Sequence, residues 1–367
     1  MKGIECIELR KFITEYKQKN EKNEFKPVAV GKYGIRTRES IYSKELAKDY
    51  SKNKIIFKNT LTVGMGSRQI DIGILTDDVI YSVSPAYHTY KISGINADYL
   101  RYCLMCRNED MFKRFVKRGS RQGKSIDLKR WLEYEIPVYD VCNQEKIVLK
   151  LDKVTNVISM RKQQLQKLDE LIQARFVELF GDPTINTKKY PLKLLPEIAE
   201  YWNGLTYKPD DVADKGTIVL RSSNIQNMTL DFEDIVRVNC KIGEKKYVHE
   251  NDILMCSRNG SARLVGKVAL IKNIEEPMSF GAFMLIIRSA YYPYLMTYFQ
   301  MPAFRAQIVT GATTTINQIT GRMLDNVKLP VPDMYVVNQF ADFVNQVNKS
   351  KLVIKNLLQI YKHQIQM

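Results

Sequence analysis

The chain has 367 residues, enough for two or three domains, and 45% of them are apolar, which excludes a largely disordered protein. Lys and Arg number 56 against 40 Asp and Glu, and the resulting charge of +16 favours a polyanionic partner such as nucleic acid. No run of 18 apolar residues occurs, the N-terminus lacks signal-peptide character, and six cysteines are scattered along the chain. We therefore expect a cytoplasmic protein with free thiols and no membrane partner.

The first predicted module covers residues 1–140 and mixes strands with one helix. Strand patterns occur at residues 55–57, 61–63, 70–75 and 79–90. Residues 98–116 have apolar side chains at helical spacing and predict a single helix. Two polar loops interrupt the module, a Gly-rich turn at residues 64–69 and a basic loop at residues 117–124. Exposed loops of this kind carry binding residues more often than the strands between them.

A long helix is predicted next, over residues 141–183. Its apolar positions step by four and three and are Ile147, Leu151, Val154, Ile158, Leu165, Leu168 and Ile172. This heptad spacing favours coiled-coil packing over an isolated surface helix, although Arg161 interrupts the seam. Gly181 and Pro183 provide a stop signal.

The second predicted module covers residues 184–333, and a C-terminal helix follows over residues 334–367. The module shows strand patterns at residues 264–270 and 279–288, with polar loops at residues 257–263 and 311–318. The helix has Lys351 in its seam and apolar positions at Phe340, Val344, Val347, Ile354, Leu358, Tyr361 and Ile365. Two ordinary amphipathic helices, each packed on its own domain, remain the alternative to a coiled coil.

The two halves of the chain repeat each other. Ile136-Pro137-Val138 is followed by Asn143-Gln144, and Leu329-Pro330-Val331 is followed by Asn338-Gln339, with a separation of 330 − 137 = 193 residues at the prolines. A period this long indicates a duplicated domain rather than a solenoid unit. We predict an α+β fold with two modules in tandem pseudo-symmetric repeat, each followed by a long helix. Because the loops differ while the frame is shared, the two modules should recognise different targets.

Motifs for catalysis and metal binding are missing from the sequence. There is no phosphate loop, and Gln69 stands where the third glycine of a dinucleotide fingerprint would be. Cys103 and Cys106 form a lone CxxC without a second ligand pair, so we expect no metal site. The chain is expected to bind without catalysing a reaction and to have no catalytic residue.

Several segments resemble the specificity subunit of a type I restriction–modification enzyme. The resemblance covers nearly the whole chain. It rests on the boundary at residues 136–144 with the helix end at residues 167–183, on residues 203–209 and 220–225, and on residues 252–261. The C-terminal helix departs from the family pattern, because three residues are inserted before Asn338 and Gln364 replaces an apolar seam residue.

The resemblance implies two target-recognition domains that each read one half of a bipartite, asymmetric site in double-stranded DNA. It implies that the two long helices pair as an antiparallel coiled coil, set the gap between half-sites and dock two modification subunits. Those subunits would methylate adenine with S-adenosylmethionine, which requires base flipping. Up to two restriction subunits would add ATP-dependent translocation and cleavage. S-adenosylmethionine, ATP and magnesium are thus expected in the partners, and no cofactor is expected in this chain.

Candidate DNA-binding residues follow from the chemistry of base edges, since Arg suits guanine, Asn or Gln suits adenine, and Thr suits a thymine methyl group. In the first module they are Ser67, Arg68, Gln69, Arg118, Arg121, Gln122 and Lys124. In the second they are Arg221, Asn224, Arg258, Asn259, Ser261, Arg263, Thr313, Thr314, Thr315, Asn317 and Gln318. Each could instead be a solvated turn residue or a phosphate contact, which positions the protein without reading sequence.

Two other functions stay open on the sequence. The chain could serve as the specificity or DNA-binding subunit of another restriction or anti-phage assembly, and the enzymes that co-purify with it would decide this. It could also be a coiled-coil scaffold that binds proteins only, but loops rich in Arg, Gln and Asn speak against that function.

Overall fold

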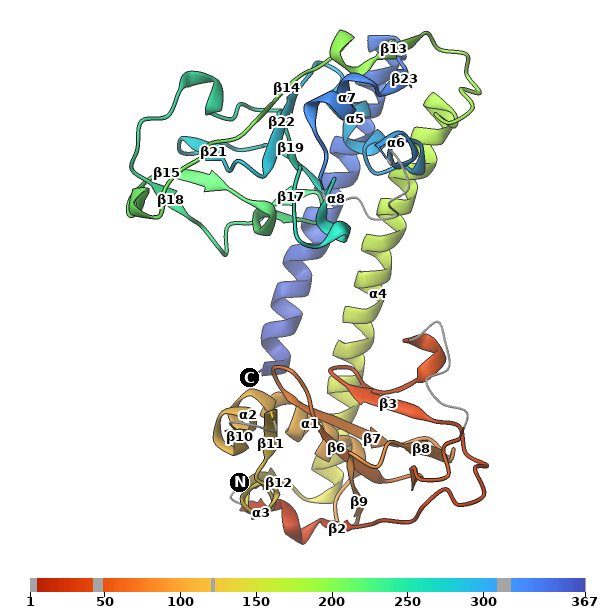
Figure 1. Cartoon of the computed structure of the whole chain (residues 1–367). Coiled ribbons are helices and arrows are strands. Elements are labelled where there is room, and N and C mark those ends of the chain that lie inside the picture. Colours follow the sequence, from red (N-terminus) through yellow and green to blue (C-terminus); the bar gives the residue numbers. More distant parts are fainter. Residues whose placement is uncertain (1–4, 42–48, 120–122, 309–317, 367) are drawn as a thin grey trace. The chain divides into compact units, whose positions relative to one another are not determined.

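The computed structural model describes residues 5–41, 49–119, 123–308 and 318–366 (Figure 1). The chain divides into two units. Unit 1 comprises Met1–Arg161 and Leu357–Met367, and unit 2 comprises Lys162–Asn356. Two long helices, α4 (Val141–Phe180) and α8 (Met334–Gln366), contribute a segment to each unit.

Unit 1 is built on a four-stranded antiparallel sheet. Its strand order is β2 (Ile13–Glu15), β9 (His88–Ile92), β6 (Thr60–Met65) and β7 (Ile70–Leu75). Because side chains alternate along a strand, Leu61 and Val63 of β6 face one core, whereas Thr60 and Thr62 are buried on the opposite face. That core also receives α1 (Ala97–Cys106), α2 (Asn108–Phe115) and α3 (Leu128–Leu132).

Unit 2 repeats this sheet with the same order and the same antiparallel pairing. The strands are β14 (Glu200–Asn203), β22 (Met284–Arg288), β19 (Ile253–Cys256) and β20 (Val268–Leu270). The helices that follow are α5 (Tyr292–Tyr298), α6 (Pro302–Ile308) and α7 (Gly321–Asp325). The register repeats as well, because Val63 pairs with His88 and Cys256 pairs with Met284. The predicted tandem repeat of an α+β module is therefore confirmed at the level of topology.

A short antiparallel pair closes each module at its base. β1 (Glu5–Glu8) pairs with β12 (Glu135–Val138), and β13 (Leu192–Leu194) pairs with β23 (Lys328–Pro330). Both repeated prolines, Pro137 and Pro330, lie in these two-stranded pairs, where a missing backbone N–H is tolerated. The chain thus enters and leaves each module at neighbouring strands. The strand by which it leaves is followed directly by a long helix.

Smaller strands cover the other face of each sheet. In unit 1 they are β3 (Val28–Gly31), β4 (Gly34–Thr37), β5 (Lys54–Ile56) and β8 (Tyr81–Val83), and a separate hairpin consists of β10 (Val116–Gly119) and β11 (Gly123–Ile126). In unit 2 they are β15 (Val212–Leu220), β18 (Arg237–Val238), β21 (Met278–Phe280), β16 (Ile225–Gln226) and β17 (Thr229–Leu230). β15 and β21 pair in parallel and enclose a second core of this unit.

Four expectations about local structure were wrong in detail. The strand expected at residues 264–270 is limited to β20, because residues 262–264 form a 3-10 helix. The strand pattern at residues 279–288 is divided between β21 and β22. The helix expected at residues 98–116 breaks at Arg107 into α1 and α2. The break lets the Asn108 side chain accept from the Ile70 N–H at 3.1 Å and donate to the Ile70 carbonyl at 2.8 Å. The continuous strand pattern at residues 79–90 is likewise divided between β8 and β9, because a turn separates them. Apolar spacing alone contains no signal for any of these interruptions.

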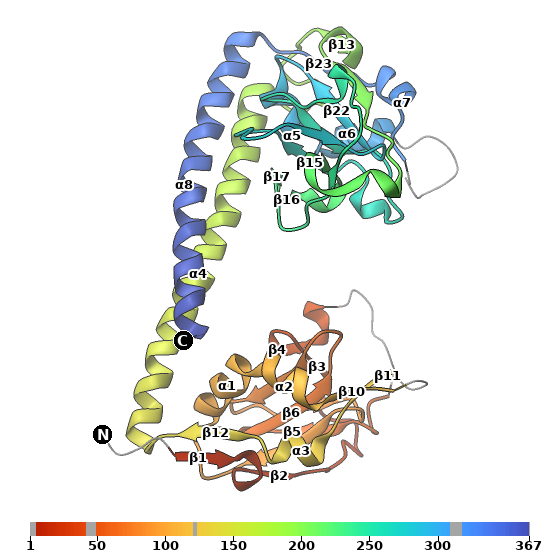
Figure 2. The ribbon, with the colours of Figure 1, turned by 90° about the vertical axis from the view of Figure 1, so that its left-hand side faces the viewer.

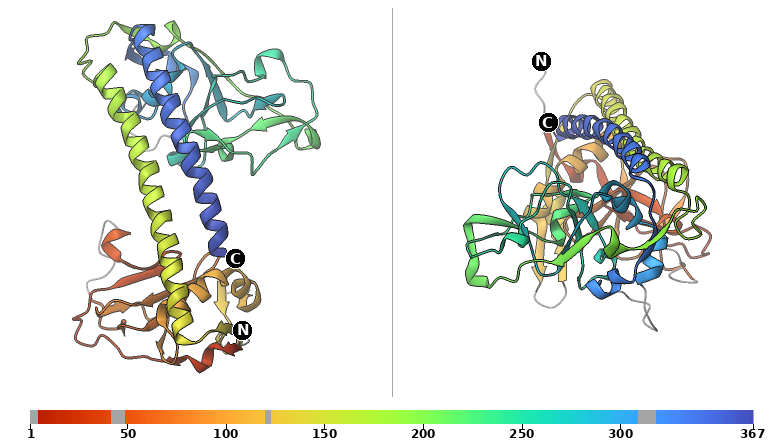
Figure 3. Two further views of the ribbon diagram at one scale, coloured as in Figure 1. Left: turned by 180° about the vertical axis from the view of Figure 1, so that it is seen from behind. Right: turned by 90° about the horizontal axis from the view of Figure 1, so that it is seen from above.

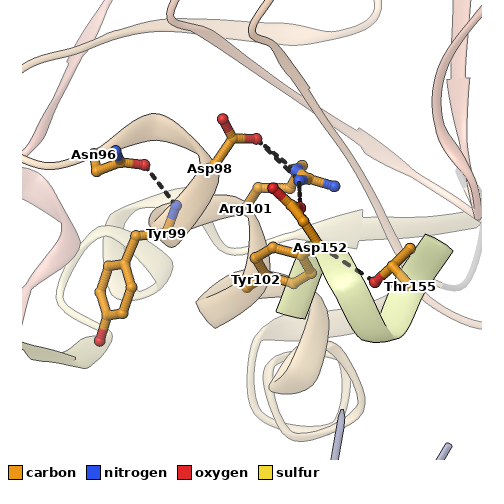
Figure 4. Close-up of polar contacts among 7 residues, drawn as sticks. All are labelled: Asn96, Asp98, Tyr99, Arg101, Tyr102, Asp152 and Thr155. Atoms are coloured by element: carbon orange, nitrogen blue, oxygen red, sulfur yellow. Dashed lines mark hydrogen bonds and ion pairs between the residues drawn. The ribbon is translucent and has the colours of Figure 1, made fainter. Parts of the chain in front are cut away.

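The first half of α4 packs against α1 within unit 1 (Figure 4). Asp152 of α4 accepts a hydrogen bond from the Tyr102 hydroxyl at 2.5 Å and lies 3.4 Å from the Arg101 guanidinium. Thr155, one turn further along α4, lies 3.3 Å from the same hydroxyl. Asn96 caps α1 by accepting from the Tyr99 backbone N–H. These bonds fix the start of the long helix to the first module.

Within unit 2, α4 and α8 pair antiparallel (Figures 2 and 3). The Lys351 ammonium lies 2.5 Å from the Asp169 carboxylate, and Phe340 contacts both Phe176 and Phe180 at ring distances of 5.6 and 5.2 Å. A later residue of α8 contacts an earlier residue of α4, so the two helices run in opposite directions. The pairing also explains a charged residue in the seam, because Lys351 is only 12% exposed and has a partner across the interface.

The seam positions predicted from heptad spacing are all buried or half-buried where the structure describes them. Ile147 and Leu151 pack on the first module's core, whereas Leu168, Ile172 and Phe340 belong to the main core of unit 2. The Ile365 side chain lies outside the described residues.

Candidate nucleic-acid interface

In unit 1, the turn between β6 and β7 presents three of the candidate residues. The Gly66 N–H donates to the Gln69 carbonyl at 3.1 Å and closes the turn. Ser67 and Arg68 are exposed, while Gln69 is half-buried and donates to Asp71 at 3.3 Å. Burial raises the pKa of the Asp71 carboxyl, and the Gln69 amide partly offsets this by stabilising the carboxylate. Arg68 is therefore the residue of this turn that has its charged group in solvent.

The basic hairpin β10–β11 lies against that turn. The Lys124 ammonium donates to the Ser67 carbonyl at 2.5 Å and lies 5.5 Å from the Phe112 ring centroid. The structure thus brings together the two loops that the sequence separates by more than 50 residues. Arg118 pairs with Lys124 in the strand register, but its side chain lies outside the described residues. The remaining candidates of this loop, Arg121 and Gln122, also lie outside them.

In unit 2, the loop after β19 presents exposed Arg258, Ser261 and Arg263. Arg258 forms an antiparallel bridge with Gln318, so the end of the second candidate loop lies beside the first. Thr313, Thr314, Thr315 and Asn317 of that loop lie outside the described residues. The Asn259 amide donates to the Ser222 hydroxyl at 3.2 Å and accepts from the Ser261 N–H at 3.0 Å, so much of its hydrogen-bonding capacity holds the loop.

Arg221 and Asn224 have roles within their own loop. Asn224 is 1% exposed, and its amide donates to the carbonyls of Asp231 and Asp234, both at 2.9 Å, and accepts from the Arg221 N–H. The Arg221 guanidinium lies 2.7 Å from the Asp234 carboxylate. A buried amide with all these partners shapes the backbone rather than presenting a surface.

A concavity of about 1040 Å³ opens between these segments of unit 2. Its lining includes Tyr207, Arg221, Ser222, Arg258, Asn259 and Phe283. Phe283 is 60% exposed, and the Arg258 guanidinium lies 5.4 Å from its ring centroid. Sequence reasoning missed Phe283 and Tyr207. An aromatic residue in the turn Gly281-Ala282-Phe283 between two strands was the available signal, since aromatic side chains are common where proteins contact nucleic acids.

The described residues contain no group of three or more His, Cys, Asp and Glu side chains that could hold a metal ion. Burial raises the pKa of both thiols of the lone CxxC, Cys103 and Cys106. Among the described helices, none is long and apolar enough to cross a membrane.

The fold is one found in type I restriction–modification systems. A chain of a solved type I R-M system, reported for its complex assembly and conformational transition, superimposes with a TM-score of 0.56 at 15% identity, covering 100% of this chain and 96% of that one. The type I restriction-modification system S subunit from M. genitalium gives a TM-score of 0.52 at 12% identity, covering 100% and 95%. Similarity at these identities establishes a shared fold over the full length.

Part of the sequence also matches a known family. Residues 7–170 are similar to the type I restriction modification DNA specificity domain. No curated protein matches the sequence. The family match and the shared fold agree with the resemblance to type I specificity subunits.

Proposed function

We propose that this chain is the DNA specificity subunit of a type I restriction–modification complex and that it reads a bipartite, asymmetric site in double-stranded DNA. One observation carries the proposal: two modules share a strand order and register but present different loops. Ser67-Arg68-Gln69 projects from one sheet, and Arg258-Asn259 projects from the corresponding end of the other. Two readers with different side chains would recognise two different half-sites.

Recognition within each module would divide between phosphates and bases. Exposed Lys and Arg side chains supply phosphate contacts, which give affinity without sequence information. Arg68 and Lys124 of the first module and Arg258 and Arg263 of the second are our leading contacts, joined by the Thr and Gln side chains of the loop at residues 313–318. Asn224 would act indirectly, by holding the loop that carries Arg221.

The long helices would connect reading to modification. The antiparallel pair would set the distance between half-sites and dock two modification subunits, with up to two restriction subunits joining them. S-adenosylmethionine, ATP and magnesium would be bound by those partners, in the cytoplasm, and none by this chain. Large apolar side chains that are exposed on both helices, among them Met160 of α4 and Leu352 of α8, support this assignment of partners.

The test is binding of the chain, together with its co-purifying subunits, to a library of random duplex DNA. We expect enrichment of two short motifs separated by a fixed gap and co-purification of an adenine methyltransferase. Arg258→Ala should relax one motif and leave the other unchanged, because the residue belongs to one module. Absence of any bipartite preference would refute the proposal, and co-purification of unrelated enzymes would assign the chain to another defence assembly.

A further inference from the structure

Tyr87 and Phe283 occupy equivalent positions in the two modules. Tyr87 immediately precedes His88, the residue of β9 that pairs with Val63, and Phe283 immediately precedes Met284, the residue of β22 that pairs with Cys256. Both aromatic residues therefore stand at equivalent corners of the two four-stranded sheets. The two corners differ in what the ring does.

In unit 1 the ring is turned onto its own sheet. Tyr87 lies across Gly64, where an added Cβ atom would overlap the ring, and its hydroxyl donates to the Val30 carbonyl at 3.0 Å. The concavity at this corner measures about 280 Å³. The ring fits inside the module because Gly64 has no side chain to displace it, and the hydrogen bond of the phenolic hydroxyl holds it there.

Unit 2 has neither the glycine nor the hydroxyl that hold the ring in unit 1. Ser257 occupies the place of Gly64, at 257 − 64 = 193 residues further on, and phenylalanine has no hydroxyl with which to anchor the ring. Phe283 is 60% exposed and borders the larger concavity of about 1040 Å³. Its carbonyl accepts from the N–H groups of Ser257 at 2.9 Å and Arg258 at 3.1 Å. These backbone bonds hold the ring and the arginine side by side.

The two arginines of this concavity are in different electrostatic states. Arg221 is paired with Asp234, which neutralises it. Among the described residues, no carboxylate lies within ion-pair distance of Arg258, whose guanidinium instead lies over the Phe283 ring. Stacking on a ring restricts the guanidinium plane while leaving its N–H edge open, and this edge matches the two acceptors that guanine presents in the major groove.

We propose that Phe283 is a positioning residue that holds Arg258 to read one guanine in the half-site of the second module. This inference rests on the proposed function. Among the described residues, the equivalent corner of the first module has no such pair, because Tyr87 is turned inward and Met65 stands at the position of Arg258, at 258 − 65 = 193.

The test compares four variants of the chain, in complex with its co-purifying subunits, on a duplex library with both half-sites randomised. Phe283→Leu and Arg258→Lys should each reduce the preference for guanine at the same single position by about tenfold. Phe283→Tyr, which keeps a ring under the guanidinium, should preserve that preference. Tyr87→Phe serves as the matched control in the other module and should leave the second half-site unchanged.

The outcomes separate the alternatives. If Phe283→Leu weakens binding equally on all sequences, or changes nothing while Arg258→Lys does, Phe283 does not position the arginine and the inference fails. If Arg258→Lys is without effect at any position, Arg258 is not a base reader and the inference also fails. A wild-type chain without bipartite preference would refute the proposed function itself. Thermal unfolding of each variant distinguishes lost recognition from lost folding, and Arg258→Lys, at an exposed position, keeps the test available if Phe283→Leu does not fold.

Discussion

At the scale of single residues, the two glutamines of the repeated Asn-Gln pair lie in different environments. Gln144 is buried, accepts from the Asn96 N–H at 2.9 Å and donates to the Tyr139 carbonyl at 2.7 Å, which ties α4 to the loop before α1. Gln339 is exposed. Since α4 starts after Asp140 and α8 after Asp333, the position equivalent to Gln144 is Val337, which is fully buried. The sequence repeat aligned two residues that the structure does not make equivalent.

Gln144→Ala should therefore destabilise unit 1 by about 2 kcal/mol, because it removes a buried side chain and leaves a part-buried N–H and a part-buried carbonyl without their partner. Gln339→Ala should change stability by less than about 0.5 kcal/mol. The two tryptophans make this measurable, since Trp131 lies in unit 1 and Trp202 in unit 2. Urea unfolding followed by Trp131 fluorescence in a Trp202→Phe background reports unit 1, and equal effects of the two substitutions would contradict the assignment.

Asp252 also has a structural role. Its carboxylate is 1% exposed, accepts two bonds from Arg288 at 2.7 and 2.8 Å, and accepts from the His249 N–H at 2.7 Å. Asp252→Asn should destabilise unit 2 by about 2 kcal/mol, because the half-exposed Arg288 loses its charged partner. Trp202 fluorescence in a Trp131→Phe background reads out this unit. A change confined to DNA preference, without loss of stability, would show that Asp252 belongs to the interface instead.

At the scale of elements, the long helices are held by aromatic packing rather than by charge. Phe176 and Phe180 contact each other, and both contact Tyr294 and Phe340, with ring centroids 4.8 to 5.6 Å apart. All four side chains are buried. The Lys351–Asp169 pair lies at the same interface, but Asp169 is half-exposed and the pair is solvated. Burial of aromatic area contributes several kcal/mol, whereas an ion pair of this kind contributes at most about 1 kcal/mol.

Phe176→Ala should accordingly destabilise unit 2 by about 3–5 kcal/mol through the cavity it leaves. Val177→Ala, at the neighbouring exposed position of the same helix, is the control and should be nearly neutral. Urea denaturation followed by Trp202 fluorescence measures both. Comparable small shifts for the two variants would mean that the aromatic cluster does not hold α4 in this unit.

At the scale of the whole molecule, duplication and net charge act together. On the proposed function, a charge of +16 would give affinity for DNA of any sequence, and two sets of loops would add specificity at two places. The site would be asymmetric because equivalent sheet corners carry Tyr87 in one module and Phe283 with Arg258 in the other.

Binding of the complex to its site should weaken steeply with salt. Each phosphate neutralised by Lys or Arg contributes a slope of about −0.9 in a plot of log affinity against log salt. Arg68→Gln should make this slope shallower by about 1 if Arg68 contacts a phosphate, with the sequence preference unchanged. Fluorescence anisotropy across a salt series measures this. An unchanged slope combined with lost preference at one base would make Arg68 a base reader.

The sequence determined the duplication, the two long helices and their seams, and the polar loops, because heptad spacing and repeated turn segments are local patterns. Only the tertiary structure decided which loops meet. The Lys124–Ser67 bond and the Arg258–Gln318 bridge join segments far apart in the chain. The tertiary structure also decided that Asn224 and Gln144 are buried and that Phe283 is exposed. Burial depends on which segments pack against a residue, and the spacing of residues within one segment does not indicate which distant segment will cover it.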